Sequence, residues 1–545
     1  MVSVIVDKNQ LFKLANVKLN NAELEDALLS IKCSLEAQNA QTNQITIEVT
    51  GDRPDMLSVA GIARSLSGIF EKETGLAKQN YLPAKWKLIA DEQALKIRPY
   101  IASAIVKNAK LNDSLIAEIF NQQEKVAHTL GRKRTKVSVG AWDIEGLVGP
   151  IHFRLADDSE TFVPLKSNTT MNMEQTIATH QRGKEYGHLL PNGKYPVLAD
   201  SKKNIIALIP ITNSQHSSIT TKTTEFGIDA EGTDFQAVNS ALSLMCQDFI
   251  DLGFSVEKMT VVMPKQTIQT PDTQIRTMEI PLKYIEKRLG FALTFQTAID
   301  CLKKTRLNAI KKNDNLQVQV PSYRSDFMHQ ADIVEEIALG YGLNNIKPNK
   351  LHTFTKGSLS ETTLQENLYR DFFVGAGYLE VSNYVLTNSE INNKAKVQEE
   401  LIEISNPISS DYHGLRTNLI SGLLKTISEN THRSYPQKIF EVGKVVYHEP
   451  KLEEKIATGT NACCLSAHSQ ASLSEICSVL YELSLMKRAK LTLKPFNSPQ
   501  FIENRACIVE WNGMKIGIAG EIHPQVLTDF KIEMPICTFE IKCII

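Results

Sequence analysis

The stretch from Val320 to Ile346, VPSYRSDFMHQADIVEEIALGYGLNNI, decides how the middle of the chain folds, because it holds four acidic residues close together. Asp332, Glu335 and Glu336 have the spacing i, i+3 and i+4, so all three project from one side of a helix that begins just before them. Asp326 lies in the preceding loop and could fold back over them. The spacing predicts an acidic surface at the start of a helix.

Three interpretations of this acidic surface are open. Converging carboxylates repel one another unless a hard cation joins them, and Mg²⁺ prefers such oxygen ligands. Acidic residues in a first helical turn also complement the helix dipole by about 0.3 to 1 kcal/mol each, and a loop aspartate can accept backbone hydrogen bonds. A carboxylate acid–base pair is the third interpretation, although no neighbouring residue supplies a nucleophile or an oxyanion donor. Spacing alone favours the simple helix start.

The residues around this stretch predict a compact module over residues 270–348. Gly290 ends one short helix, Thr294 caps a second, and LQVQV alternates apolar residues with glutamines until Pro321 ends the strand. Two short helices and a small sheet are typical of a winged-helix module.

Residues 1–83 predict an N-terminal α/β domain. Asn20 and Glu23 have the spacing of a weak capping box at a helix start. QITIEVT, residues 44–50, alternates as a half-buried strand does, and leads into GDRPDMLSVAGIARSL, residues 51–66. The latter predicts a turn and a helix, which either pack a core or form a binding loop.

Residues 84–269 mix helix-like stretches, short strands and loops, and include the basic run GRKRTK. Such a run is either a solvated face or a surface that grips RNA phosphates. Its basic residues are Arg132, Lys133, Arg134 and Lys136.

Residues 349–545 begin with an amphipathic helix and continue with several strand-like stretches, in which Asn512-Gly513 is a strong signal for a two-residue hairpin. This order predicts a mainly antiparallel sheet with flanking helices. The whole chain is therefore expected to be an α+β protein of several domains, as its 545 residues also indicate.

The composition excludes several classes of protein. With 60 Lys+Arg against 61 Asp+Glu and 42% hydrophobic residues, the chain has no global bias toward nucleic acid, so RNA contacts must come from local patches. Charge appears early, at Asp7, and no apolar run reaches about 18 residues, so neither a secretory signal nor a membrane span is expected. The nine scattered cysteines lack a C-x-x-C pair, which favours reduced, buried thiols of a cytoplasmic protein over a zinc site.

Common catalytic signatures are missing from the sequence. It has no G-x-x-x-x-G-K-[ST] phosphate loop, no dinucleotide-binding glycine motif, no G-x-S-x-G elbow and no H-E-x-x-H helix. The chain therefore carries no signature of an autonomous nucleotide-using or hydrolytic site.

Five stretches, taken together and in order, resemble the β subunit of phenylalanyl-tRNA synthetase in its shorter archaeal and eukaryotic form. They are GDRPDMLSVAGIARSL, HTLGRKRTKVSVGAWD, the acidic stretch quoted above, LRTNLISGLLKTISEN with KIFEVGKVV, and GIAGEIHPQVL. The resemblance covers nearly the whole chain. It implies a cytoplasmic α₂β₂ heterotetramer that attaches phenylalanine to tRNA(Phe) at the expense of ATP.

In that family the α subunit holds the synthetic site and binds most of the ATP, while the last β domain has a class II synthetase fold without catalysis. Arg416 and KIFEVG are similar to the sheet that would carry an ATP-binding arginine, but no G-x-G-x-x-x-R motif follows. No catalytic residue for aminoacyl transfer is therefore expected in this chain. The family also has a Mg²⁺ site shared with the α subunit, whose D-x₅-D-x₂-E-E pattern falls on Asp326, Asp332, Glu335 and Glu336. The resemblance thus favours the metal interpretation.

The segment 84–269 is similar to an editing domain that hydrolyses tyrosine misattached to the tRNA. An apolar synthetic pocket rejects an added hydroxyl only weakly, so a second hydrolytic site makes physical sense. The matching positions make Asn213, Asp229 and Thr233 candidates for the editing pocket. For Asp229, a structural hydrogen-bonding role and a substrate-binding role are both open.

Three positions depart from the family's editing motifs. Trp142 replaces a histidine, Thr212 replaces an isoleucine in I-I-N, and Glu231 replaces a threonine in D-V-T-G-T-D. These changes weigh against editing activity but leave the domain fold in place. Alternative functions are a stand-alone tRNA-binding or deacylase protein without an α partner, and a purely structural scaffold.

Overall fold

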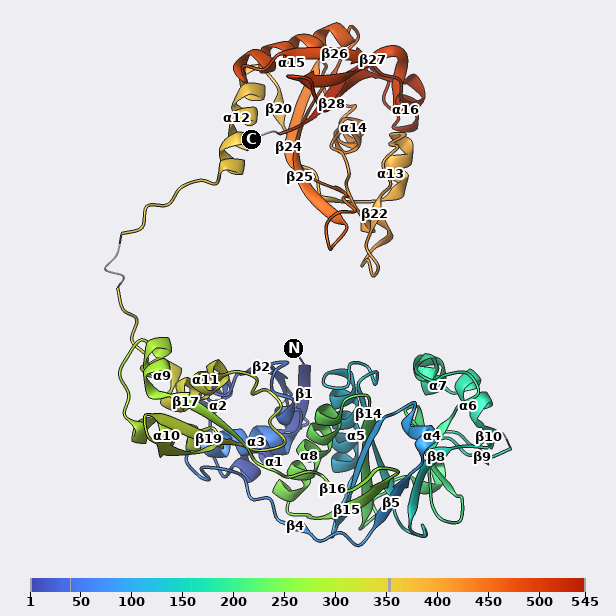
Figure 1. Cartoon of the computed structure of the whole chain (residues 1–545), viewed down its shortest axis with the longest axis vertical. Coiled ribbons are helices and arrows are strands. Elements are labelled where there is room, and N and C mark those ends of the chain that lie inside the picture. The colour runs from blue at the N-terminus through green and yellow to red at the C-terminus, as the bar shows by residue number, and fades with distance from the viewer. Residues whose placement is uncertain (1, 40, 158, 351–353, 544–545) are drawn as a thin grey trace. The chain divides into compact units, whose positions relative to one another are not determined.

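The computed structural model describes residues 2–39, 41–157, 159–350 and 354–543. The chain forms two compact units, Met1–Asn349 and Lys350–Ile545, which are drawn from blue to red along the sequence in Figure 1. This mixed α/β organisation agrees with the expected multidomain class.

The first unit starts with a small antiparallel sheet in the strand order β1-β3-β2. Asn20 and Glu23 form the expected capping box at the start of a helix, here with both hydrogen bonds present. The predicted strand is β3, whose apolar residues are buried. The elements are β1 (Val2–Asp7), α1 (Lys8–Ala15), α2 (Asn21–Leu29), β2 (Cys33–Asn39), β3 (Gln44–Val49) and α3 (Val59–Ile69).

The next part of the first unit is built on an eleven-stranded sheet. Its helices α5 and α8 pack against strands β6, β7 and β14, and Figure 1 shows both helices beside β14. The strands are β4 (Tyr81–Leu82), β5 (Lys87–Ala90), β6 (Tyr100–Lys107), β7 (Val137–Asp143), β8 (Ile151–Leu155), β11 (Pro196–Ala199), β12 (Ile205–Leu208), β13 (Thr212–Asn213), β14 (Phe226–Gly232), β15 (Ser255–Met263) and β16 (Gln266–Thr270). The helices are α4 (Glu92–Leu95), α5 (Asp113–His128), α6 (Met173–Thr179), α7 (Gln181–Tyr186) and α8 (Phe235–Asp251), and β9 (Thr161–Phe162) pairs with β10 (Met171–Asn172) outside the sheet.

The first unit ends with a three-stranded sheet and three helices. Gly290 ends its first helix with a positive φ of 82°, and Thr294 caps the second through its side chain. The third helix starts at Gln330, where the acidic spacing placed it. The elements are β17 (Arg276–Pro281), α9 (Leu282–Leu289), α10 (Phe295–Lys304), β18 (Asn308–Lys312), β19 (Asn315–Val320) and α11 (Gln330–Tyr341), with sheet order β17-β19-β18.

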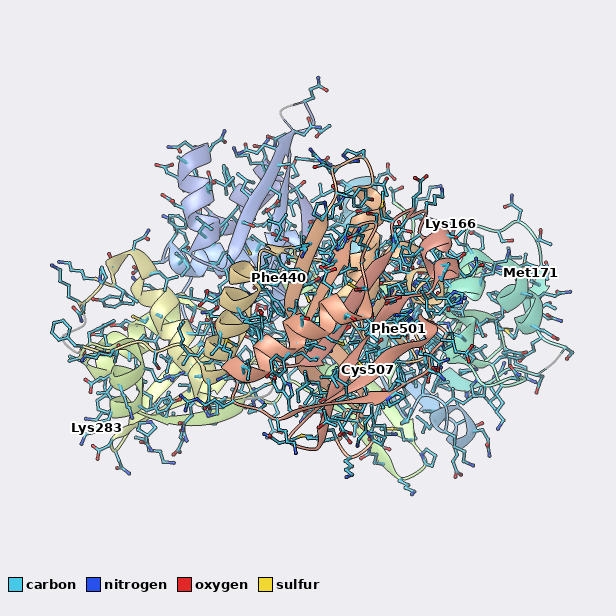
Figure 2. The ribbon with its side chains drawn as sticks, turned by 90° about the horizontal axis from the view of Figure 1, so that it is seen from above. Lys166, Met171, Lys283, Phe440, Phe501 and Cys507 are labelled. Atoms are coloured by element: carbon cyan, nitrogen blue, oxygen red, sulfur yellow. The ribbon has the colours of Figure 1, made fainter. Side chains whose placement is uncertain are left out.

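The second unit is built on a seven-stranded sheet that is antiparallel except for the β20–β24 pair. Alternate residues of β25 face opposite sides: Cys463 packs with helix α14, whereas Cys464 packs with α12 and α15. Phe440, labelled in Figure 2, packs on the same side as Cys464, with α12 and α15. The expected hairpin joins β27 to β28 through Asn512 and Gly513, both with positive φ.

The elements of the second unit are α12 (Glu361–Gly375), β20 (Leu379–Glu380), β21 (Leu386–Thr387), α13 (Ser389–Lys394), β22 (Ile402–Glu403), β23 (Gly414–Leu415), α14 (Ile420–Glu429), β24 (Gln437–His448), β25 (Ile456–Ala467), α15 (Leu473–Met486), β26 (Leu491–Pro495), β27 (Phe501–Trp511), β28 (Met514–Ile522), α16 (Pro524–Asp529) and β29 (Ile536–Lys542). Among the described residues, no helix has both the length and the apolar character needed to cross a membrane. The nine cysteines are free thiols, of which Cys477 and Cys543 are half-buried and the other seven buried.

Candidate functional site

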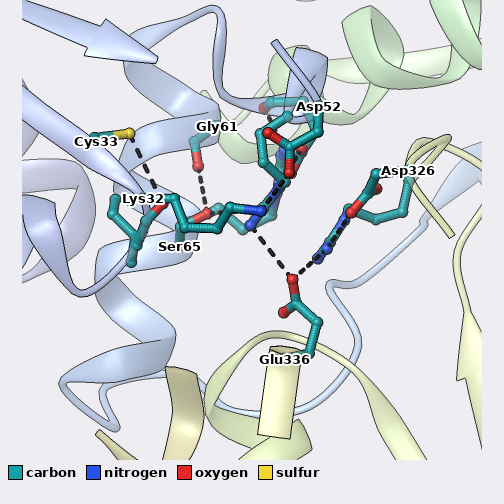
Figure 3. Close-up of polar contacts among 12 residues, drawn as sticks. Lys32, Cys33, Asp52, Gly61, Ser65, Asp326 and Glu336 are labelled. Carbon is teal, nitrogen blue, oxygen red and sulfur yellow. Dashed lines mark hydrogen bonds and ion pairs between the residues drawn. The ribbon is translucent and has the colours of Figure 1, made fainter. Parts of the chain in front are cut away.

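The acidic stretch is organised by Arg324, which lies in the loop before α11. Its guanidinium donates two hydrogen bonds to Asp326, from Nε at 2.9 Å and from Nη2 at 2.7 Å, and a third from Nη2 to Glu336 Oε1 at 2.7 Å. Figure 3 shows Asp326 and Glu336 pointing toward the same guanidinium nitrogens. Burial opposes the charge of Arg324, but Glu336 and Asp326 outweigh it and hold its pKa well above the ordinary value.

A second arginine reaches the same carboxylate from the N-terminal part of the unit. Arg53 lies in the GDRPD turn and donates two hydrogen bonds to Asp55, at 2.8 and 2.9 Å, while its Nη1 lies 3.6 Å from Glu336 Oε1. Burial and the nearby Arg324 lower the pKa of Arg53, but Asp55 and Glu336 outweigh them and raise it. The sequence left open whether the GDRPD turn packs a core or forms a binding loop. In the structure the turn contacts the acidic stretch.

The other two acidic residues face different partners. Asp332 accepts hydrogen bonds from the backbone N–H groups of Met328 and His329, both at 2.7 Å, and so caps α11. Glu335 is half-exposed and pairs with Lys32 at 3.1 Å, and Lys32 also pairs with Asp52. Burial lowers the pKa of Lys32, but these two carboxylates outweigh it and raise the pKa overall.

The four acidic residues are thus placed on one side of the module but do not converge. Over the described ranges, no three Asp, Glu, His or Cys side chains are grouped so that they could hold a metal ion. Two of the four neutralise Arg324 and a third caps the helix, so the set does not fit a four-carboxylate site as it lies here. Glu336 Oε2 has no hydrogen-bond partner and borders a cavity of about 10 Å³, which is the size of one water molecule.

A larger cavity, of about 690 Å³, lies among α5, β7, β14 and the loops before β10 and β13. Of the expected pocket residues, Asn213 and Asp229 line it, and Asn213 Nδ2 donates to the carbonyl of Ala141 at 2.7 Å. Thr233 lies outside the cavity lining and is exposed, and its N–H bonds to the carbonyl of Lys136. Lys166 and Met171, also on the wall, are labelled in Figure 2.

The strand register explains how polar side chains reach the cavity floor. In the β7–β14 ladder, Asp229 lies opposite Gly140, and Glu231 lies opposite Ser138. A Cβ at Gly140 would lie 2.7 Å from Asp229 Oδ1, so only glycine leaves room for this carboxylate. Residues two apart on a strand share a face, so Asp229 and Glu231 lie side by side.

Asp229 accepts a hydrogen bond from Trp142, one of the three side chains that depart from the expected motifs. Trp142 Nε1 donates to Asp229 Oδ1 at 2.7 Å, whereas Asp229 Oδ2 and Glu231 Oε2 have no hydrogen-bond partner. Ser138 Oγ donates to Glu231 Oε1. Burial raises the pKa of Asp229, and burial together with the charge of Asp229 raises that of Glu231 well above its ordinary value.

The sequence-based predictions did not place Glu231 beside Asp229 on one face of β14. The i, i+2 spacing of two acidic residues in a strand could have shown that they share a face. Nothing local indicated Ser138 or the buried Arg98, whose charge favours the ionised form of Glu231.

The basic run divides into two pairs, and of its four basic residues Arg134 lines this cavity. Arg134 is held by the protein: its Nη1 donates to the carbonyls of Pro210 and Ile211, its Nη2 donates to Glu124, and it stacks on Tyr186 at 4.3 Å. Lys136 pairs with Asp234 at 3.4 Å. The other pair, Arg132 and Lys133, is exposed.

In the second unit, Arg416 is buried and hydrogen-bonded through its Nε and Nη1 atoms. Its Nη1 donates to Glu441 at 2.5 Å and to the carbonyl of Asn383, and its Nε donates to the carbonyl of Lys444 at 2.8 Å. A Cβ at Gly443 would lie 2.4 Å from Nη2, so this glycine makes room for the guanidinium. Arg416 therefore supports the sheet of its own unit.

Comparison with known proteins covers both units. Three family models match: the B3/4 domain over residues 106–245, the tRNA synthetase B5 domain over 278–343, and the phenylalanyl tRNA synthetase beta chain CLM domain over 346–543. The chain is 32% identical over 544 residues to the phenylalanine–tRNA ligase beta subunit of Thermococcus sibiricus, covering 98% of this chain and 97% of that protein. It is 31% identical over 529 residues to the beta subunit of Archaeoglobus fulgidus, covering 95% and 94%.

A solved structure is also similar. It is an N-terminal fragment of the phenylalanyl-tRNA synthetase β-subunit from Pyrococcus horikoshii, with a TM-score of 0.61 and 30% identity. The match covers 63% of this chain and all of the fragment.

Proposed function

Because the chain belongs to the family of phenylalanine–tRNA ligase β subunits and acts as part of that ligase, we propose that it assembles with an α subunit into an α₂β₂ heterotetramer in the cytoplasm. The match to β subunits over 98% of the chain carries this proposal. The same match disfavours a stand-alone deacylase or a scaffold. The complex would bind tRNA(Phe) and use ATP and a divalent metal.

The second unit is proposed to be a class II synthetase-like domain without catalysis, preceded by segments 1–83, 84–269 and 270–348, the last of winged-helix type. The engagement of Arg416 with Glu441 supports this assignment, because a buried guanidinium whose Nη1 and Nε already bond to Glu441 and to the carbonyl of Lys444 is poorly placed to bind a nucleotide. ATP would then be bound by the α subunit.

Of the four acidic residues, Asp332 and Glu335 are the two that do not bond to Arg324, so we consider them for the metal. Glu335 is half-exposed, and Mg²⁺ commonly keeps several waters and takes only one or two carboxylates from a chain. We therefore assign Asp332 and Glu335 as this chain's ligands in a site completed by the α subunit. Asp326 and Glu336 would orient the loop and helix through Arg324.

For tRNA, the exposed Arg132 and Lys133 are the proposed phosphate contacts, because Arg134 and Lys136 already have carboxylate partners. Arg134, the residue after Lys133, lines the 690 Å³ cavity. A cavity of this size beside a basic loop supports a second role, in which the end of a tRNA is bound for editing.

Co-expression with an α subunit from the same organism tests the assembly. We expect a stable complex of two α and two β chains that forms Phe-tRNA(Phe), with little activity from the α subunit alone. A chain that stays monomeric in the presence of the α subunit and adds nothing to its activity would contradict the proposal.

A further inference from the structure

The loop between α5 and β7, which carries the basic run, has a strained backbone. Arg132, Lys133 and Arg134 follow one another with positive φ values of 48°, 53° and 63°. In the parts of the chain that the structure describes, no other adjacent non-glycine residues share this left-handed conformation. A residue with a Cβ is strained there, and such strain persists only where the surrounding structure holds it. Neighbouring groups must therefore hold residues 132–134, which we call the left-handed turn.

The group that holds this turn is Arg98, which lies in the loop between α4 and β6. We propose that Arg98 is a positioning residue for tRNA, because it keeps the left-handed turn in the conformation that presents Arg132 and Lys133 to phosphates. This inference deepens the proposed function and rests on the tRNA contacts proposed above.

The hydrogen bonds of Arg98 carry the inference. Arg98 is 3% exposed, and its guanidinium donates from Nη2 to the carbonyl of Arg134 at 2.6 Å and from Nη1 to the carbonyl of Thr135 at 3.0 Å. Both bonds end where the chain leaves the left-handed turn. A buried cation is costly unless its donors are satisfied, so Arg98 and the turn depend on each other.

The chain also returns closely upon itself around the turn. The N–H of Lys136 donates to the carbonyl of Gly131 at 2.8 Å, which closes the loop. A Cβ at Gly131 would lie 2.1 Å from the carbonyl oxygen of Val137, so only glycine permits this return. The closed loop fixes the ends of the turn, and the guanidinium of Arg98 fixes its carbonyl groups.

The turn separates its three basic side chains. Arg134 bonds to the carbonyls of Pro210 and Ile211 in the cavity wall, whereas Arg132 and Lys133 are exposed. A turn that is already ordered presents these two cations together, and a mobile one would have to be ordered at each binding event, which costs affinity. Loss of Arg98 should therefore remove their phosphate contacts.

The first measurement is amide hydrogen exchange over residues 129–137, with each variant purified in complex with the α subunit. Arg98→Met should speed this exchange by roughly tenfold or more, the fold-change expected for losing a hydrogen bond from a charged donor. Arg154→Met is the matched control, because Arg154 bonds to Glu160 instead, and it should leave the exchange unchanged. Exchange in Arg98→Met at the rate of the unchanged chain would overturn the inference.

A pair of substitutions at Lys133 tests the strain itself. Lys133→Gly and Lys133→Ala remove the same charge, but only glycine adopts a positive φ without strain. In the Arg98→Met background, exchange should be roughly threefold or more slower with glycine than with alanine. Equal rates would show that Arg98 does not oppose strain. Arg98→Lys, which keeps the buried charge but not the two-pronged donor, replaces Arg98→Met if the latter does not fold.

The second measurement is the slope of log Kd for tRNA(Phe) against log salt concentration, which reports the number of phosphate contacts. Arg98→Met should lower this slope as much as Arg132→Ala combined with Lys133→Ala, by roughly 1.5. Combining all three substitutions should lower it no further, because they remove the same contacts. Arg154→Met should keep the slope of the unchanged chain.

The slopes separate failure of this inference from failure of the proposed tRNA contact. A lowered slope in the double alanine variant, with an unchanged slope in Arg98→Met or a further loss when the three are combined, would contradict the role of Arg98 alone. An unchanged slope in the double alanine variant would overturn the proposed contact and, with it, the positioning role.

Discussion

Arg53 Nη1 and Glu336 Oε1 lie 3.6 Å apart, and both side chains are almost completely buried. One residue belongs to the turn after β3 and the other to α11, so this ion pair joins the N-terminal sheet to the acidic module. Its surroundings contain Arg324, Asp326 and Asp55, which satisfy most of the remaining donors and acceptors. The buried charges therefore form one network between two parts of the first unit.

Removing the charge of Glu336 should strongly destabilise the first unit. Glu336→Gln leaves Arg53 and Arg324 buried with one carboxylate fewer, and breaking a buried ion pair typically costs about 3 to 5 kcal/mol. In urea unfolding of the full chain, the transition of the first unit should move to a lower urea concentration. Glu335→Gln, at the half-exposed neighbouring position, is the matched control and should change stability by about 0.5 kcal/mol or less. Equal effects of the two substitutions would argue against the buried network.

Replacing the two proposed Mg²⁺ ligands should weaken assembly. Asp332→Asn combined with Glu335→Gln should reduce Mg²⁺-dependent association with the α subunit, because an amide oxygen attracts the dication less than a carboxylate does. Sedimentation velocity with Mg²⁺ and with a chelator measures the effect. Glu403→Gln, in the second unit, is the control. If neither the chelator nor the double substitution changes assembly, Asp332 and Glu335 are not metal ligands.

The basic run should contribute to tRNA binding through two of its four residues. Arg132→Ala combined with Lys133→Ala should lower the slope of log Kd against log salt concentration by roughly 1.5, since each lost phosphate contact contributes about 0.7 to 0.9. Filter binding of tRNA(Phe) between low and moderate salt gives the slope. Lys283→Ala, which removes an exposed lysine on α9, is the control and should leave the slope unchanged. An unchanged slope in the double variant would assign the run to a solvated face.

The second unit should lose stability as the pH rises toward neutrality. Glu540 is buried and accepts hydrogen bonds from the N–H groups of Leu419 and Ile420 and from Asn461, and burial raises its pKa from 4.5 to about 7. When folding raises the pKa of an acid, the protonated acid stabilises the folded state at pH values below the pKa of the unfolded state. This stabilisation is lost as the pH rises through the pKa of the folded state. The loss between pH 4.5 and pH 8 is about 3 kcal/mol.

Glu540→Gln should therefore flatten the pH dependence of unfolding over this range. Chemical unfolding of the full chain at several pH values between 5 and 8, followed through the second unit's transition, measures the change. Glu503→Gln, which is exposed on β27, should leave the profile as it is. A profile of the same steepness in Glu540→Gln would show that other groups set the pH dependence.

Several features were predictable because they depend on residues close in sequence. The helix start at Gln330, the caps at Asn20 and Thr294, the stop at Gly290 and the Asn512-Gly513 hairpin all occur as expected. Each depends on a local backbone conformation or on a side chain that reaches a backbone group a few residues away. The family could be identified for a related reason, because its motifs are also short and contiguous.

The partners of the charged residues were decided only by the tertiary structure. Spacing placed Asp332, Glu335 and Glu336 on one side of a helix, but it could not show that Arg53 reaches Glu336 from the N-terminal turn or that Lys32 reaches Glu335. The sequence could not show which residues line the cavity either, because Thr233, one of the three expected pocket residues, lies outside its lining.

The sequence by itself therefore determined the family, the order of the elements and the position of the acidic helix. The tertiary structure decided which charges neutralise one another and which oxygens of Asp229 are occupied. The physical reason is range: helix caps and turns depend on neighbouring residues, whereas a buried charge takes its partner from whatever segment the fold brings within hydrogen-bond distance.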